Sequence, residues 1–133
     1  SAHVDYLTPN ESEAQLISGL PVADVAGAEA AARWLMAQGV RTPVITLGAK
    51  GALASGAGGF MHVPGRKVEV VDTTGAGDAF NGALAVALGE GKDLAAAVAF
   101  ANTAAALQVT QRGTAPAMPR REAVESFLAQ KDG

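Results

Sequence analysis

The fold of this chain is decided by the stretch Val70-Val71-Asp72-Thr73-Thr74-Gly75-Ala76-Gly77-Asp78-Ala79-Phe80-Asn81-Gly82-Ala83-Leu84. It reads as a β-rich run, then a polar turn with two glycines, then a long helix rich in Ala, Leu and Val over residues 76–88. A strand that passes through a glycine turn into a helix is a building block of α/β layer structures. We therefore predict an α/β fold in which helices cover a sheet.

The same turn predicts an anion site. The N-terminus of a helix presents free backbone N–H groups and the positive end of the helix dipole, and glycines at 75 and 77 let phosphate oxygens approach closely. The carboxylate of Asp78 stands beside this site, where it can accept the proton of an attacking hydroxyl. This pattern indicates phosphoryl transfer. The alternative is that residues 72–78 form only a well-capped helix start, with Asp78 complementing the dipole.

Two other phosphate-binding motifs are excluded. The dinucleotide fingerprint requires a glycine where Phe80 stands. Gly91-Lys92 is followed by Asp93 and preceded five residues earlier by Val86, so it is not a P-loop of the Walker A type. The phosphate site therefore belongs to another class.

The rest of the chain alternates short apolar runs with helical patterns. Gly19 and Gly39 are predicted to end helices in the left-handed conformation, and Asp93 to cap one. Gly113 is predicted to end the helix over residues 94–110, and Pro119 to open the last helix. The predicted strands are residues 4–7, 44–47, 52–55, 60–63 and 67–71, and the predicted helices are residues 11–18, 28–39, 76–88, 94–110 and those from 119 onward.

The composition of the chain excludes several classes of function. The chain has 133 residues, 49% of them hydrophobic, and a net charge of −3, which is typical of one globular domain. It lacks the basic stripe that nucleic acid requires, so we expect no nucleic-acid partner. The apolar run over residues 94–107 is interrupted by Asn102 and Thr103, and it is shorter than the about 20 residues that a helix needs to cross a bilayer. No signal peptide is recognised either. We therefore expect no membrane partner. The absence of cysteine favours a reducing cytoplasm.

Aromatic residues are only 5% of the chain, and Ala, Val and Leu supply most of the apolar mass. Small side chains let helices pack closely on a sheet, but each contributes little burial energy. We therefore expect the core to depend on a further packing surface.

Four segments together resemble the ribokinase (PfkB) family of carbohydrate kinases, over nearly the whole chain. Residues 72–82 are similar to the family's C-terminal signature, and Val63-Pro64-Gly65 to the segment before it. Thr8-Pro9-Asn10-Glu11-Ser12-Glu13-Ala14 resembles the family's Asn-x-x-Glu motif, and Thr46-Leu47-Gly48-Ala49-Lys50-Gly51 its nucleotide-contacting turn. The order and spacing of all four agree, which argues against coincidence.

The resemblance implies that Asp78 is the catalytic base and that Gly75, Ala76 and Gly77 form the anion hole. It implies that Asn10 contacts the nucleotide phosphates and that Glu13 organises Mg²⁺ through water. The nucleotide is expected against Asn10, Thr46, Leu47, Gly48, Ala49, Lys50, Gly51, Gly77 and Asn102. The alternative is that these residues have purely structural roles. Asn10 would then be a turn residue, Glu13 an exposed helix residue, Lys50 a solvated turn residue, and Asn102 a core residue whose amide is hydrogen-bonded.

The resemblance also implies a monovalent cation, usually K⁺, held mainly by carbonyl groups around the signature turn and the loop after the long helix. The corresponding residues here are Asp72, Thr74, Gln108, Gln111, Gly113 and Ala117. His3 and His62 show no partner pattern and receive no role.

The resemblance begins inside the family pattern, so residues 1–133 are expected to be the C-terminal nucleotide-binding and catalytic portion of a ribokinase-like domain. The N-terminal sugar-binding half and the lid have no counterpart here. We expect ATP-dependent phosphorylation of ribose or a related sugar, with this chain inactive alone because it cannot place the acceptor. A stand-alone nucleotide-binding or regulatory module is the alternative, and another sugar, a sugar acid or a nucleoside stays open as acceptor, as does a homo-oligomer.

Overall fold

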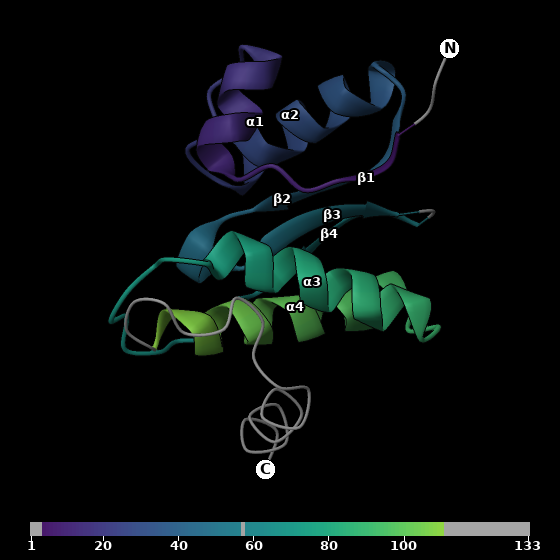
Figure 1. Cartoon of the computed structure of the whole chain (residues 1–133). Coiled ribbons are helices and arrows are strands. Elements are labelled where there is room, and N and C mark those ends of the chain that lie inside the picture. The colour runs from purple at the N-terminus through teal and green to yellow at the C-terminus, as the bar shows by residue number, and fades with distance from the viewer. Residues whose placement is uncertain (1–3, 57, 111–133) are drawn as a thin grey trace. The chain divides into compact units, whose positions relative to one another are not determined.

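The computed structural model describes residues 4–56 and 58–110, which fall into two compact units that divide between Val63 and Pro64. The first unit is a sheet with helices, and the second contains a pair of helices (Figure 1). The prediction of an α/β structure with helices on a sheet is confirmed by the first unit.

The first unit holds a four-stranded sheet in the order β1-β2-β3-β4. Strand β2 pairs with β1 in parallel and with β3 antiparallel, and β3 pairs with β4 antiparallel. Helices α1 and α2 connect β1 to β2 and lie on one side of that strand pair (Figure 1). The elements are β1 (Val4–Leu7), α1 (Glu11–Ser18), α2 (Val25–Ala37), β2 (Val40–Thr46), the 3₁₀ turn η1 (Gly48–Lys50), β3 (Ala52–Gly56) and β4 (Gly59–Val63).

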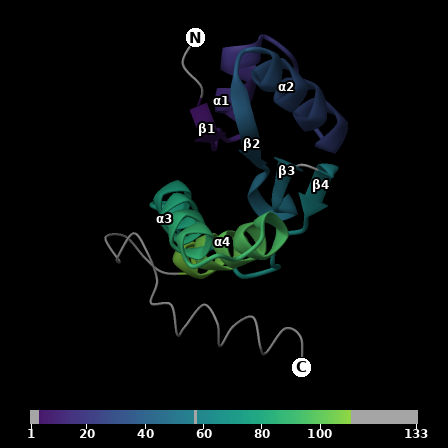
Figure 2. The same ribbon diagram turned by 90° about the vertical axis from the view of Figure 1, so that its right-hand side faces the viewer.

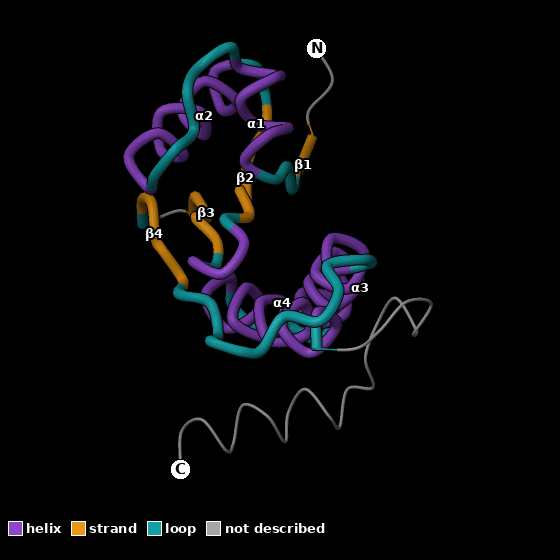
Figure 3. Tube along the Cα trace, turned by 90° about the vertical axis from the view of Figure 1, so that its left-hand side faces the viewer, coloured by secondary structure: helices purple, strands orange, loops and turns teal. Residues whose placement is uncertain are grey.

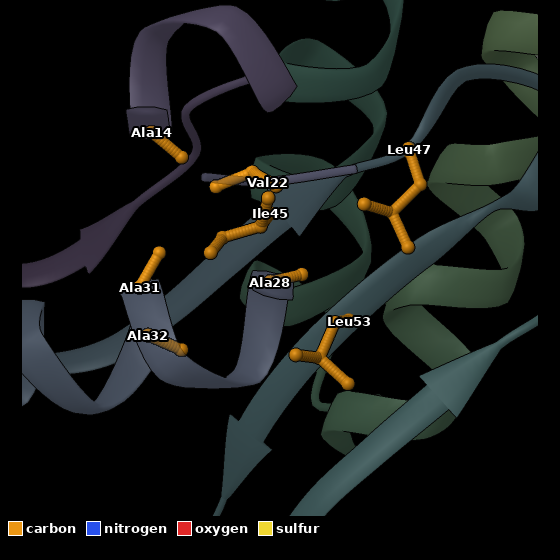
Figure 4. Close-up of a cluster of buried hydrophobic side chains, with 8 residues drawn as sticks. All are labelled: Ala14, Val22, Ala28, Ala31, Ala32, Ile45, Leu47 and Leu53. Carbon is orange, nitrogen blue, oxygen red and sulfur yellow. The ribbon is translucent and has the colours of Figure 1, made fainter. Parts of the chain in front are cut away.

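The core of this unit is built from small side chains on α1 and α2 that face larger ones on the sheet (Figure 4). Ile45 on β2 and Leu53 on β3 are almost fully buried, and the alanines opposite them are completely buried. Alanine has no long side chain to hold the backbones apart, so these helices approach the sheet closely. The cluster comprises Ala14, Val22, Ala28, Ala31, Ala32, Ile45, Leu47 and Leu53.

The second unit contains α3 (Ala76–Gly89) and α4 (Leu94–Val109), which lie side by side (Figure 2). The carboxylate of Asp93 accepts a 2.8 Å hydrogen bond from the N–H of Ala96 and so caps α4 as predicted. Helix α4 is apolar on most of its surface and is buried accordingly. Its buried residues are Ala97, Val98, Phe100, Ala101, Asn102, Thr103, Ala104, Ala106 and Gln108.

Most predicted elements are confirmed to within one or two residues, and α1 agrees at both ends. Gly19 ends it with a φ of 73°, as expected. The helix predicted from residue 28 begins earlier, at Val25, because Asp24 caps it by accepting from the N–H of Gly27 at 2.8 Å. None of the helices within residues 4–56 and 58–110 has both the length and the hydropathy of a membrane-spanning segment.

Strand β2 is longer than predicted. It begins at Val40, four residues before the predicted start, and Pro43 lies inside it instead of marking its boundary. The reason is its partner: Val40 stands opposite Val4 and Pro43 opposite Leu7 in the parallel pair with β1. Pairing across the sheet therefore extends the strand beyond its most apolar residues.

The strand predicted at residues 67–71 is wrong. This segment is irregular and belongs to the loop between β4 and α3 (Figure 3). Val70 and Val71 are 58% and 49% exposed, and the N–H of Val71 bonds to the carbonyl of Val109 at 2.7 Å. A β-rich sequence forms a strand only where a neighbouring strand pairs with it. The predicted helix from residue 119 lies outside the described residues.

Replacing Asp93 with Ala removes the cap of α4 and should lower the free energy of unfolding by about 1 kcal/mol. Urea denaturation followed by circular dichroism measures the change. Asp93→Asn is the matched control, because asparagine caps about as well as aspartate. Equal stability of the Ala and Asn variants would contradict the role of the cap.

Candidate functional site

The turn before α3 is held by its own side chains and by the end of α4. One carboxylate oxygen of Asp72 accepts from both the N–H and the hydroxyl of Thr74, at 2.8 and 2.6 Å. The carbonyl of Val109 accepts from the N–H groups of Val71 and Asp72, at 2.7 and 3.1 Å. A local loop and a distant helix end thus fix the same few residues.

Gly75 brings the chain into α3. It occupies the N-cap with a φ of 79°, a left-handed backbone that glycine adopts without steric cost. The N–H of Ala76 bonds to the carbonyl of Thr73 at 3.2 Å, and that of Ala79 to the carbonyl of Gly75 at 2.9 Å. The turn therefore satisfies the first amide of the helix, and the helical ladder starts at its fourth residue.

The two amides between these bonds are open. In the part of the chain that the structure describes, the N–H groups of Gly77 and Asp78 have no acceptor, and both residues are exposed. A Cβ placed on Gly77 would meet no atom within 4 Å, so the space over this backbone is clear. Two exposed N–H groups at the positive end of a helix form a site for an anion.

Asp78 lies in the first turn of α3, next to these amides. Among residues 4–56 and 58–110, no donor or cation contacts its carboxylate, which is exposed. The two open amides and an unpaired carboxylate are therefore within one helical turn. The roles predicted for Asp78 as base and for residues 75–77 as anion hole are compatible with this geometry and stay predictions.

In the first unit, Asn10 and Glu13 form a capping box at the start of α1. The N–H of Glu13 donates to the side-chain oxygen of Asn10 at 2.8 Å, and the N–H of Asn10 donates to a carboxylate oxygen of Glu13 at 2.9 Å. Both side chains are exposed. The box occupies one oxygen of each and leaves the amide nitrogen of Asn10 and the second oxygen of Glu13 for a ligand. The predicted nucleotide and Mg²⁺ roles fit this geometry and stay predictions.

The structure brings Asn10 to the end of β2. Asn10 forms a parallel bridge with Thr46, and the N–H of Thr46 donates to the carbonyl of Pro9 at 3.0 Å. The two predicted nucleotide segments, 36 positions apart in the chain, therefore meet at the carboxyl ends of parallel strands. Ligands of open α/β sheets bind at such ends.

The turn after Thr46 has a glycine at each end. Gly48 and Gly51 have φ values of 59° and 97°, and the N–H of Leu47 bonds to the carbonyl of Gly51 at 2.8 Å. Gly48, Ala49 and Lys50 are exposed, as a nucleotide-contacting turn requires.

Sequence reasoning missed His62. Its Nε2 lies 2.7 Å from the carbonyl oxygen of Lys50, so the imidazole braces this turn. His62 stands opposite Leu53 in the β3–β4 pair, and this strand register brings the imidazole close to Lys50. A short strand with one histidine carries no signal of such a contact.

Asn102 and the predicted cation ligands are placed in the second unit. The buried Asn102 donates from Nδ2 to the carbonyl of Pro64 at 3.3 Å, which suits a satisfied core asparagine as well as a nucleotide contact. Asp72, Thr74 and Gln108 come together, since Nε2 of Gln108 donates to the carbonyl of Thr74 at 3.3 Å. That carbonyl has a second lone pair, so it can still bind a cation. Gln111, Gly113 and Ala117 lie outside the described residues.

The sequence profile described as pfkB family carbohydrate kinase matches residues 1–121. The chain belongs to this family. It is 42% identical over 125 residues to the ribokinase of Haemophilus influenzae, a match that covers 94% of this chain and 41% of that protein. The chain therefore spans about two-fifths of the length of that relative.

Two solved structures agree with this assignment. The Arabidopsis thaliana ribokinase complexed with ribose and ATP superimposes with a TM-score of 0.85 at 36% identity, covering 93% of this chain and 40% of that chain. A putative ribokinase II from E. coli, in complex with ATP and Mg²⁺, superimposes with a TM-score of 0.80 at 34% identity, covering 95% and 39%. The fold is thus the corresponding portion of a ribokinase fold.

Replacing Gly75 with Ala should cost about 1–2 kcal/mol of unfolding free energy, because the left-handed backbone disfavours a Cβ. That Cβ would also lie 3.2 Å from Nε2 of Gln108. Gly89→Ala is the control, since its Cβ meets nothing within 4 Å and its φ is not positive. Denaturant titration should show Gly89→Ala unchanged or more stable, and equal effects of both variants would contradict the constraint at Gly75.

Proposed function

We propose that this chain is the nucleotide-binding and phosphoryl-transfer part of an ATP-dependent sugar kinase most like ribokinase. The observation that carries the proposal is the first turn of α3, where the open N–H groups of Gly77 and Asp78 adjoin the unpaired carboxylate of Asp78. The amides suit an anion whose charge grows during the reaction, and the carboxylate suits a base.

In this proposal the carboxylate of Asp78 takes the proton of the sugar hydroxyl as its oxygen attacks the terminal phosphorus of ATP. The new bond joins that oxygen to phosphorus, and the bond from phosphorus to the ADP oxygen breaks. The open N–H groups of Gly77 and Asp78, which follow the turn through Gly75 and Ala76, donate to the oxygens that carry the negative charge of the transferred group. The cost of arranging these dipoles is met when the chain folds, so little reorganisation accompanies the reaction.

The nucleotide is assigned to the site at the end of β2. Asn10 offers its side-chain amide nitrogen to phosphate oxygens, and the exposed turn at residues 48–50 lies against the nucleotide. Magnesium, when bound, neutralises phosphate charge, and the second carboxylate oxygen of Glu13 would hold one of its waters. Carbonyls of Asp72 and Thr74 would hold a monovalent cation beside the anion-binding turn. The relatives solved with ATP, with ribose or with Mg²⁺ support these assignments.

Asp78→Asn, made in the full-length natural protein that carries these residues, should lower turnover by about 10²- to 10⁴-fold, because it removes the base. ATP affinity should stay within a few-fold, since the backbone amides remain. Coupled ADP release and calorimetry measure the two quantities. Asp93→Asn is the matched acid-to-amide control. Turnover of Asp78→Asn at the level of that control would reject Asp78 as the base.

The 133-residue chain by itself should bind ATP without turning over ribose. The larger part of the Arabidopsis ribokinase chain has no counterpart here, and a base without a positioned acceptor lacks in-line geometry. ADP release with ribose and ATP tests this expectation, and robust turnover would defeat it. Micromolar ATP binding without turnover, in a natural protein that starts near Ser1, would favour the alternative of a stand-alone nucleotide-binding module.

A further inference from the structure

Gln108 lies in the last turn of α4, and its side chain is directed at the anion-binding turn rather than at solvent. The residue is only 2% exposed. Its Nε2 donates to the carbonyl of Thr74 at 3.3 Å, across 34 positions of sequence, and lies 3.2 Å from the place that a Cβ on Gly75 would take. A glutamine buried against a glycine turn is therefore in contact with the backbone that leads into α3.

Folding stability does not account for this side chain. Among the described residues, no donor reaches its other amide atom, Oε1, which is buried. An unmet buried acceptor is costly, whereas an apolar side chain of the same shape avoids that cost. The hydrogen bond that the side-chain Nε2 of Gln108 donates to Thr74 is long, at 3.3 Å. An apolar residue would pack here at least as well.

Another buried polar residue of α4 behaves differently. The hydroxyl of Thr103 bonds to the carbonyl of Ala99 at 2.9 Å, so its polar group is satisfied within its own helix. Gln108 instead reaches out of the helix to the turn. Its neighbour Val109 does the same with its backbone, accepting from Val71 and Asp72. The last two residues of α4 thus hold the turn at its start and again at Thr74.

We infer that Gln108 is a positioning residue for phosphoryl transfer, an inference that rests on the function proposed above. By fixing the carbonyl of Thr74, it sets the orientation of the peptide between Thr74 and Gly75. That peptide leads directly into the helix start whose open amides belong to Gly77 and Asp78. In this inference Gln108 acts on the reaction through the turn, by its bond to Thr74, in place of the cation-ligand role that the resemblance implied.

The test is Gln108→Met in the full-length natural protein, because methionine keeps the length and removes both amide atoms. The melting temperature should be unchanged or higher, while kcat falls by about ten- to a hundredfold with a smaller change in the KM for the sugar. A residue with a merely structural role would instead lower the melting temperature and leave kcat of the folded fraction intact. Thr103→Val is the matched buried polar-to-apolar control in the same helix and should leave kcat unchanged.

Gln108→Asn is the second variant, since it keeps a buried amide but withdraws it from Thr74 by one methylene. A loss of kcat in this variant supports the inference even where the methionine variant does not fold. A wild-type kcat in either folded variant overturns the inference. Failure of both variants to fold overturns it too, because Gln108 would then have a structural role. The kcat of Asp78→Asn is measured in parallel. Wild-type kcat of Asp78→Asn would reject the proposed function itself. A low kcat of Asp78→Asn together with a wild-type kcat of Gln108→Met would reject only the role of Gln108.

Discussion

The left-handed backbone at Gly75 is the constraint on which the candidate chemistry depends. With a φ of 79°, this residue turns the chain into α3 so that the turn satisfies Ala76 while the amides of Gly77 and Asp78 stay open. A residue with a Cβ resists this conformation, and the Cβ would lie only 3.2 Å from Nε2 of Gln108. Because the helix begins abruptly here, its unsatisfied donors and its positive end coincide with one acidic side chain.

The two segments that carry candidate site residues, one in each unit, are stabilised in the same way. Each is a helix start held by a local network, the Asn10–Glu13 capping box at α1 and the Asp72–Thr74 turn before α3. Each is then fixed by a more distant element, β2 in the first unit and the end of α4 in the second. Short-range bonds specify each shape, and tertiary contacts keep it in place.

The cores that support these networks are made largely of alanine, so little apolar area is buried per residue. Leu16 is 86% exposed on α1, and Val70 is 58% exposed before the signature turn. The chain spans about two-fifths of its ribokinase relative. The exposed apolar side chains and the alanine-rich core agree with the expectation, made from the composition, that a further protein surface packs against this chain.

The sequence by itself determined what local interactions control. The bounds of α1, the cap of α4 at Asp93 and the glycine entry to α3 all follow from residues within a few positions of one another. It also indicated the family, through motifs that are themselves short. Only the tertiary structure decided the start of β2, the irregular path of residues 67–71, and the contacts of His62 and Gln108. These depend on strand pairing and on side chains 12 to 34 positions apart, and no periodicity or turn motif encodes which distant group lies opposite.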